Sequence, residues 1–220
     1  MIDAHDAPLS APLSAPLSAL SSAPVWSCGW LSNARRCESP NFGPRPAGLP
    51  IDLALIHSIS LPPGEYGGDA IERLFTNRLD WDAHPYFSQI RGLTVSSHFV
   101  VRRDGELVQF VSCDDRAWHA GASAWRGRDG CNDFAVGIEL EGLEGSVFDP
   151  RQYEALAWLM KALARQYPVT AVAGHEHVAP GRKFDPGPGF DWSHLMAILE
   201  WPCEYFPDEV ERAAASFPAR

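Results

Sequence analysis

Residues 51–59 read I-D-L-A-L-I-H-S-I, a short apolar run with several β-branched positions. A run of this length and composition predicts a buried β-strand. His57 lies near its end, and a loop rich in proline and glycine follows. Because open sheets present ligands at the carboxyl ends of their strands, His57 is a candidate metal ligand. The alternative is a strand-end histidine bonded to a loop carbonyl.

Further strands are predicted along the chain. Segments 97–103 and 106–112 flank Asp104-Gly105, one of the strongest short signals for a β-hairpin. Arg102 and Arg103 precede this turn, where we expect a solvated pair. Two more strands are predicted in residues 134–142 (F-A-V-G-I-E-L-E-G) and 169–173.

Helices are predicted between these strands. Asp149-Pro150 supplies an N-cap and a first-turn proline, and the helix that it opens has one apolar face, formed by Tyr153, Leu156, Met160, Leu163 and Tyr167. Asp69 and Glu72 have the spacing of a capping box, and Asp191 is placed to cap a last helix that runs through Leu199. Strands mixed with helices, hairpin included, predict an α/β fold with a central mixed β-sheet flanked by helices.

Length and composition favour one folded domain. The chain has 220 residues, of which 45% are hydrophobic, enough for one core. Residues 7–18 are three copies of A-P-L-S, which fit neither a helix nor a central strand. We therefore expect a disordered leader over residues 1–24 and a single domain over 25–220.

Charge and cysteine use restrict the partners and the compartment. The formal net charge of −10, without a long basic run, argues against nucleic acid or an anionic membrane as partner. No apolar run approaches the ~20 residues of a membrane span. Five scattered cysteines suit free, mostly buried thiols in a reducing compartment. The start of the chain lacks the basic region of a secretory signal, so a cytoplasmic location is expected.

The densest chemistry lies in residues 174–189, G-H-E-H-V-A-P-G-R-K-F-D-P-G-P-G. Imidazole and carboxylate are zinc ligands, so His175, His177 and Asp185 are candidates. Lys183 is suited to stabilising an oxyanion. The pattern therefore predicts a metal hydrolase site, provided that another histidine reaches it. Spacing alone does not choose between the two histidines of this cluster.

For other polar residues, the sequence does not decide between a place in the functional site and a structural role. His98 and His119 fit either a satisfied core or a pocket wall, and the segment 118–121 (W-H-A-G) suits the wall of a pocket for a polar ligand. Glu139 and Glu141 share one face of the strand predicted at 134–142. Either one is a candidate general base, and pairing across the sheet is the alternative for both.

Several ordered blocks resemble the N-acetylmuramoyl-L-alanine amidase (amidase type 2) family. The resemblance covers about residues 28–200 and rests on L-I-H-S-I-S-L-P-P-G-E-Y-G-G (55–68), H-P-Y-F (84–87), V-S-S-H-F-V-V-R-R-D-G-E-L-V-Q-F-V (95–111), R-A-W-H-A-G (116–121), C-N-D-F-A-V-G-I-E-L-E-G (131–142) and A-P-G-R-K-F-D-P-G-P-G-F-D-W (179–192). It implies the fold shared by these amidases and the peptidoglycan recognition proteins.

The resemblance also implies roles for single residues. It assigns one zinc ion to His57, His175 and Asp185, and catalysis to Glu139 and Lys183. It thereby favours the first histidine of the 174–189 cluster over the second and the first glutamate of the 134–142 strand over the other. The implied reaction is hydrolysis of the amide bond between (1,6-anhydro)-N-acetylmuramic acid and L-alanine of muropeptides, in cytoplasmic peptidoglycan recycling.

Two positions depart from the family pattern, and two other functions compete. Ser58 stands where the pattern has Asn, which alters a polar contact to substrate, and Phe184 stands in place of Thr and narrows the pocket. Neither belongs to the implied ligand set. One competing function is a periplasmic amidase that acts on intact peptidoglycan, and the other is a non-catalytic muropeptide-binding module. The expected partner is a small muropeptide, and the oligomeric state stays open.

Overall fold

A six-stranded mixed sheet forms the centre of the protein. The computed structural model describes residues 17 and 19–208. Its sheet has the order β12-β5-β11-β6-β7-β3, with bounds Ala171–Gly174, Leu53–Ile59, Ala135–Glu141, Phe99–Val101, Leu107–Gln109 and Arg35–Arg36. β12, β5, β11 and β6 run parallel, β6 and β7 form an antiparallel hairpin, and β3 is parallel to β7. This arrangement confirms the predicted α/β fold with a mixed sheet.

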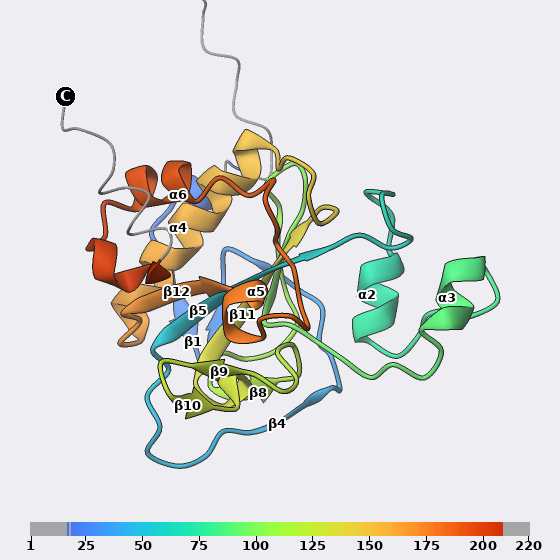
Figure 1. The fold of residues 1–220 in the computed structure, drawn as a ribbon, viewed down its shortest axis with the longest axis horizontal. Helices are drawn as coiled ribbons and strands as arrows, with labels where there is room; N and C mark the ends of the chain where they lie inside the picture. The colour runs from blue at the N-terminus through green and yellow to red at the C-terminus, as the bar shows by residue number, and fades with distance from the viewer. Residues whose placement is uncertain (1–16, 18, 209–220) are drawn as a thin grey trace, which may run out of the picture.

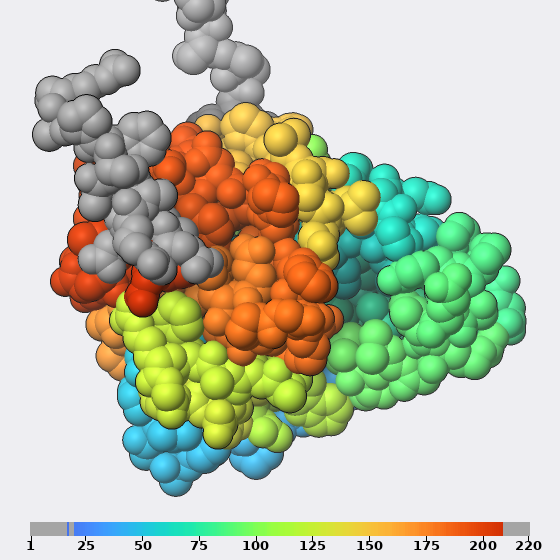
Figure 2. Space-filling view, in the orientation of Figure 1, coloured from blue at the N-terminus to red at the C-terminus, as the bar shows by residue number. Residues whose placement is uncertain are grey.

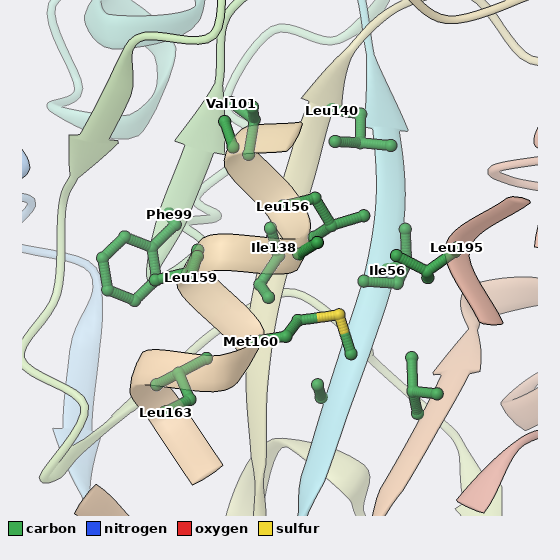
Figure 3. Packing of buried hydrophobic residues seen from close by; sticks show 14 of the residues in the cluster. Ile56, Phe99, Val101, Ile138, Leu140, Leu156, Leu159, Met160, Leu163 and Leu195 are labelled. Carbon is green, nitrogen blue, oxygen red and sulfur yellow. The ribbon is translucent and has the colours of Figure 1, made fainter. Parts of the chain in front are cut away.

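Two helices cover one face of this sheet (Figure 1). α4 (Pro150–Gln166) is capped by Asp149, whose side chain accepts a hydrogen bond from the Arg151 backbone N–H, and α6 (Trp192–Leu199) is capped by Asp191. Both caps confirm the sequence prediction. Figure 3 shows how the apolar side chains of α4 and α6 meet those of β5, β11 and β6 in one core.

The strands alternate between this core and the opposite face. Ile56 of β5 and Ile138 of β11 belong to the core under α4. Their neighbours Leu55 and His57, and likewise Glu139, therefore point to the other side of the sheet, because successive strand residues face opposite ways. The functional side chains considered below lie on that second face.

Two short helices form a lobe beside the second face of the sheet (Figure 1). α2 (Ala70–Phe75) and α3 (Pro85–Gln89) contribute Phe75 and Phe87 to a separate apolar cluster with Val100 and Phe110. The predicted capping box is wrong: Asp69 makes no side-chain cap hydrogen bond.

The carboxylate of Glu72, the other residue of that predicted capping box, has stronger partners elsewhere. It forms ion pairs with Arg35 and Arg102, both with N–O distances of 2.7 Å. Arg102 is buried and also pairs with Glu141, so the prediction of a solvated Arg102-Arg103 pair is wrong for Arg102. The sequence pattern missed this because its partners come from α2 and from the end of β11.

The remaining described elements are short. They are η1 (Ala19–Ser21), β1 (Trp26–Ser27), β2 (Trp30–Leu31), β4 (Phe42–Pro44), β8 (Asp115–Ala117), β9 (Ala124–Trp125), β10 (Arg128–Asp129), η2 (Cys131–Asp133), α5 (His175–Val178) and η3 (Cys203–Tyr205). Among the described residues, no helix is long and apolar enough to cross a membrane.

The predicted leader falls mostly outside the described residues. This holds for residues 1–16 and 18, which include nearly all of the A-P-L-S copies. Leu17 and Leu20 pack against the core under α4, so packing begins inside the segment predicted as a leader. No disulfide links the five cysteines, as predicted. Cys28 and Cys203 are exposed, however, so the expectation of mostly buried thiols does not hold for them.

Candidate active site

A cavity of about 480 Å³ opens on the second face of the sheet, at the carboxyl ends of β5 and β11. All five residues that the family resemblance singles out line it: His57, Glu139, His175, Lys183 and Asp185. Figure 2 shows the hollow between the orange surface near α5 and the green lobe of α3. Residues far apart in sequence are thus brought to one polar pocket.

The sheet places the first two of these side chains beside each other. β5 and β11 pair in parallel, and His57 is the register partner of Glu139. Register partners in a parallel pair project from the same face. Both side chains are buried, so the imidazole and the carboxylate share a poorly hydrated environment.

The loop after β12 brings in the other groups. β12 ends at Gly174, where an added Cβ would lie 2.8 Å from Pro186 Cδ, so a side chain there would push the loop away. The Glu176 backbone N–H donates to the Asp185 carbonyl at 2.9 Å. This bond folds the loop back over α5, and the carboxylate of Asp185 therefore meets the ring of His175.

The three donor atoms form a compact triangle. His57 Nδ1 and His175 Nδ1 lie 3.0 Å apart, and each lies 3.2 Å from Asp185 Oδ2. Tetrahedral zinc, with bonds of about 2.0–2.1 Å, holds two ligand atoms about 3.3 Å apart. These three are the described residues whose donor atoms cluster in this way. The triangle therefore fits one zinc ion with little movement.

The protonation states suit metal binding as well. Burial lowers the pKa of His57 to about 4, which keeps the imidazole neutral. Burial opposes ionisation of Asp185, but in the metal-free site its contacts with His175 and His57 outweigh burial and lower the carboxyl pKa. Neutral imidazole and ionised carboxylate are the forms that coordinate a metal.

The two candidate glutamates differ sharply in their surroundings. Glu139 Oε2 is buried and has no hydrogen-bond partner among the described residues. Burial, assisted by the nearby Asp185, raises its carboxyl pKa well above the usual value. Glu141 instead accepts hydrogen bonds from Arg102, from the Gly67 backbone and from the Arg103 backbone. Glu139 is therefore the glutamate that brings an unpartnered carboxylate oxygen to the cavity, whereas Glu141 holds the loop that follows β5.

Comparison with known proteins shows the family to which the chain is similar. The family model for N-acetylmuramoyl-L-alanine amidase matches residues 47–188. The 1,6-anhydro-N-acetylmuramyl-L-alanine amidase AmpD of Citrobacter freundii is 50% identical over 173 residues, which is 78% of this chain and 92% of that protein. The chain belongs to the N-acetylmuramoyl-L-alanine amidase family. The protein is accordingly an amide hydrolase.

Other relatives of this amidase agree. AmpD of Escherichia coli K12 is 49% identical over 173 residues, covering 78% of this chain and 94% of that protein. A crystal structure of a selenomethionine AmpD derivative superposes with a TM-score of 0.77 at 49% identity, over 80% of this chain and 99% of that one. An ectodomain complex of peptidoglycan recognition proteins shares the fold alone, with a TM-score of 0.50 at 18% identity.

The other histidines that the sequence left open, His177, His98 and His119, differ in their surroundings. His177 Nδ1 accepts a hydrogen bond from the Gly174 backbone, and its ring packs edge-on against Trp192 at 5.2 Å. His98 Nδ1 accepts from the Gly137 backbone, and its Nε2 donates to the Asp115 carbonyl. Of the two histidines left open between core and pocket wall, His98 is thus a satisfied core residue, and His119 lines the cavity.

The two departures from the family pattern both reach the cavity. Ser58 and Phe184 line it, and Phe184 is 58% exposed. This exposure places Phe184 at the rim of the cavity, outside the metal triangle. It adds an aromatic ring to a cavity lined by both polar and apolar residues.

Some groups that support the site escaped the sequence prediction. The Ala120 carbonyl accepts from His175 Nε2 at 3.1 Å, and Asn132 Oδ1 accepts from the backbone N–H groups of His119 and Ala120. A backbone carbonyl has no side-chain signature. The sequence offered one indirect signal, the small residues after Trp118, which allow the backbone to approach the histidine closely.

Proposed function

We propose that this amidase uses one zinc ion to hydrolyse the amide bond between 1,6-anhydro-N-acetylmuramic acid and L-alanine in muropeptides released during peptidoglycan recycling. The observation that carries the proposal is the triangle of His57, His175 and Asp185 next to the buried carboxylate of Glu139. The names of the closely similar relatives support the choice of substrate.

The three donor residues hold the metal. Two imidazole nitrogens and one carboxylate oxygen would hold it, a three-ligand donor set of the kind found in catalytic zinc sites. When bound there, zinc activates a water molecule as the nucleophile and polarises the scissile carbonyl. The remaining chemistry belongs to side chains of the protein.

Glu139 moves the proton. Its free Oε2 accepts the proton of the attacking water as the water oxygen bonds to the carbonyl carbon. The same oxygen then gives this proton to the alanine nitrogen as the amide bond breaks. A carboxyl whose pKa is raised by burial is suited to both steps, because it takes a proton readily and releases it to an amine.

Lys183 stabilises the negative charge on the carbonyl oxygen. It lines the same cavity as Glu139, and its positive charge acts on that carboxyl. One well-placed donor to an oxyanion contributes roughly 3 kcal/mol to transition-state stabilisation. Lys183→Met should therefore lower kcat about 10²- to 10³-fold while zinc content stays unchanged.

The compartment and the substrate size belong to the same proposal. We place the reaction in the cytoplasm, which the five free thiols favour, because thiols persist in a reducing compartment. There the substrate is a soluble muropeptide and not the intact wall. A cell-fractionation blot against the chromosomally encoded protein measures the location directly.

Metal analysis combined with a product assay tests the function. Protein purified without chelators should contain one zinc per chain and should release stem peptide from soluble anhydro-muropeptide, read by mass spectrometry. Asp185→Ala should lose the metal and the activity together. Faster release from insoluble sacculus would identify an enzyme of the intact wall. Muropeptide binding without zinc or cleavage would identify a binding module.

A further inference from the structure

The two histidines of the metal triangle are held from behind by one dipeptide. We propose that the segment His119-Ala120, fixed by Asn132, is a positioning element that sets the ring orientation and tautomer of both His57 and His175. This inference rests on the proposed zinc site and assigns roles to residues outside it.

The contact with His175 has a single chemical reading. His175 Nε2 lies 3.1 Å from the Ala120 carbonyl oxygen, which can only accept a hydrogen bond. His175 therefore carries a ring proton on Nε2 when its Nδ1 binds a metal. Its Nδ1 lone pair is left facing the other two donor atoms, as the metal requires.

The contact with His57 has the same form, but here the acceptor is a side-chain nitrogen and not a backbone carbonyl. His57 Nε2 lies 3.0 Å from His119 Nδ1, and the two rings meet edge-on at 84° with centroids 5.1 Å apart. His57 Nδ1 faces the metal triangle, so Nε2 carries the proton and donates it to His119 Nδ1. His119 then carries its own proton on Nε2, which has no other hydrogen-bond partner among the described residues. No competing contact dictates the opposite tautomer.

Asn132 fixes the backbone of both His119 and Ala120. Its Oδ1 accepts from the backbone N–H of His119 at 3.1 Å and from that of Ala120 at 2.8 Å. Arg182 adds a hydrogen bond to the Ala120 carbonyl at 2.8 Å. One side-chain oxygen thus fixes two consecutive residues, and each of these residues fixes one histidine of the triangle.

The sheet leaves room for this arrangement only at a glycine. A Cβ on Gly137 would lie 2.5 Å from His119 Cγ, so the His119 ring rests directly on the backbone of β11. The ring is thereby confined between β11 and His57. Because the His119 ring is confined and its Nδ1 meets His57 Nε2, it can orient His57 and does more than fill space.

A pair of variants with matched shape separates positioning from packing. Asn and Leu both branch at Cγ, but only Asn has an oxygen at the place of His119 Nδ1. Zinc affinity is measured by competition with a chromophoric chelator, alongside thermal unfolding of the metal-free proteins. His119→Leu should weaken zinc binding about 10- to 100-fold, the usual effect of losing a partner of a metal-bound histidine. His119→Asn should bind zinc within a few-fold of the unmodified protein.

The outcomes distinguish this inference from the proposed function. If the unmodified protein binds no zinc, the proposed metal site fails. If it binds zinc and both variants lose the same affinity, His119 only fills space and the inference is overturned. If His119→Leu does not fold, nitrogen-15 NMR of the unmodified zinc-bound protein tests the inference, because it shows which ring nitrogens carry protons. That spectrum must show protons on Nε2 of His57, His119 and His175, and a proton on His119 Nδ1 overturns the proposal.

Discussion

His57 and Glu139 lie side by side on one face of the sheet, as register partners on the parallel strands β5 and β11. The consequence is that a candidate metal ligand and a candidate proton carrier share one face of the sheet without any loop between them. Strand pairing fixes such a relationship more rigidly than loop packing does. The loop that carries Asp185 and Lys183 closes over this preformed pair.

Replacing Glu139 tests its role as proton carrier. Glu139→Gln keeps the shape of the side chain but cannot accept the proton of the attacking water. We expect kcat to fall about 10²- to 10⁴-fold, the usual contribution of a general base. Zinc content, measured by mass spectrometry of the metal, should stay at the level of the unmodified protein. Near-normal turnover would show that another group takes the proton.

The same variant should change how stability depends on pH. Burial raises the pKa of Glu139 in the folded protein above its ordinary value of 4.5. The unfolded chain therefore loses this proton at lower pH than the folded protein does, and the folded state of the unmodified protein loses relative stability as the pH rises above 4.5. Glutamine does not titrate, so Glu139→Gln escapes this loss.

Unfolding of the metal-free proteins measures this effect. In urea titrations, the stability advantage of Glu139→Gln should be small at about pH 4 and larger at about pH 8. The sign follows from the raised pKa of Glu139 in the folded protein. The relative stability of the folded state is highest below the pKa of the unfolded chain and falls as the pH rises. An advantage that shrinks with rising pH would mean that the folded protein stabilises the charged carboxylate instead.

Arg102 is expected to be a major contributor to stability. Its guanidinium pairs with Glu72 at 2.7 Å and with Glu141 at 3.0 Å, and its side chain is 9% exposed. Arg102→Met leaves the buried carboxylate of Glu141 without its cationic partner, which costs about 3–5 kcal/mol. The control is Arg91→Met, because the Arg91–Asp82 pair is exposed and such pairs contribute only about 0–1 kcal/mol. Chemical denaturation of both variants should separate them, and equal losses would contradict the prediction.

Gly137 should tolerate no side chain. A methyl group there overlaps the His119 ring, so Gly137→Ala should destabilise the protein by about 1–3 kcal/mol through overpacking. It should also weaken zinc binding, because displacement of His119 releases His57. Gly43→Ala is the control, since its Cβ would approach no heavy atom closer than 3.9 Å. Calorimetry with and without zinc measures both effects, and similar behaviour of the two variants would refute the prediction.

Local signals predicted the framework well. Asp149 and Asp191 cap their helices because an N-cap acts on backbone groups two or three residues away. The hairpin turn forms at Asp104-Gly105, with Gly105 at a φ of +89°. Local reasoning was wrong for Asp69 and Glu72, where the carboxylate of the second finds Arg35 and Arg102 across the fold. Such distant ion pairs have no short-range signature.

The sequence by itself determined which residue types are available and where the strands that carry them end. It placed His57 at a strand end and gathered His175, Lys183 and Asp185 within one short segment of the chain. Only the tertiary structure decided how these groups are used, because the distinction depends on contacts between distant segments. His177 turns to Trp192, while the ring of His175 is held by a backbone carbonyl 55 residues away in the chain. A carbonyl acceptor belongs to every residue, so its role becomes visible only when folding brings it to the ring.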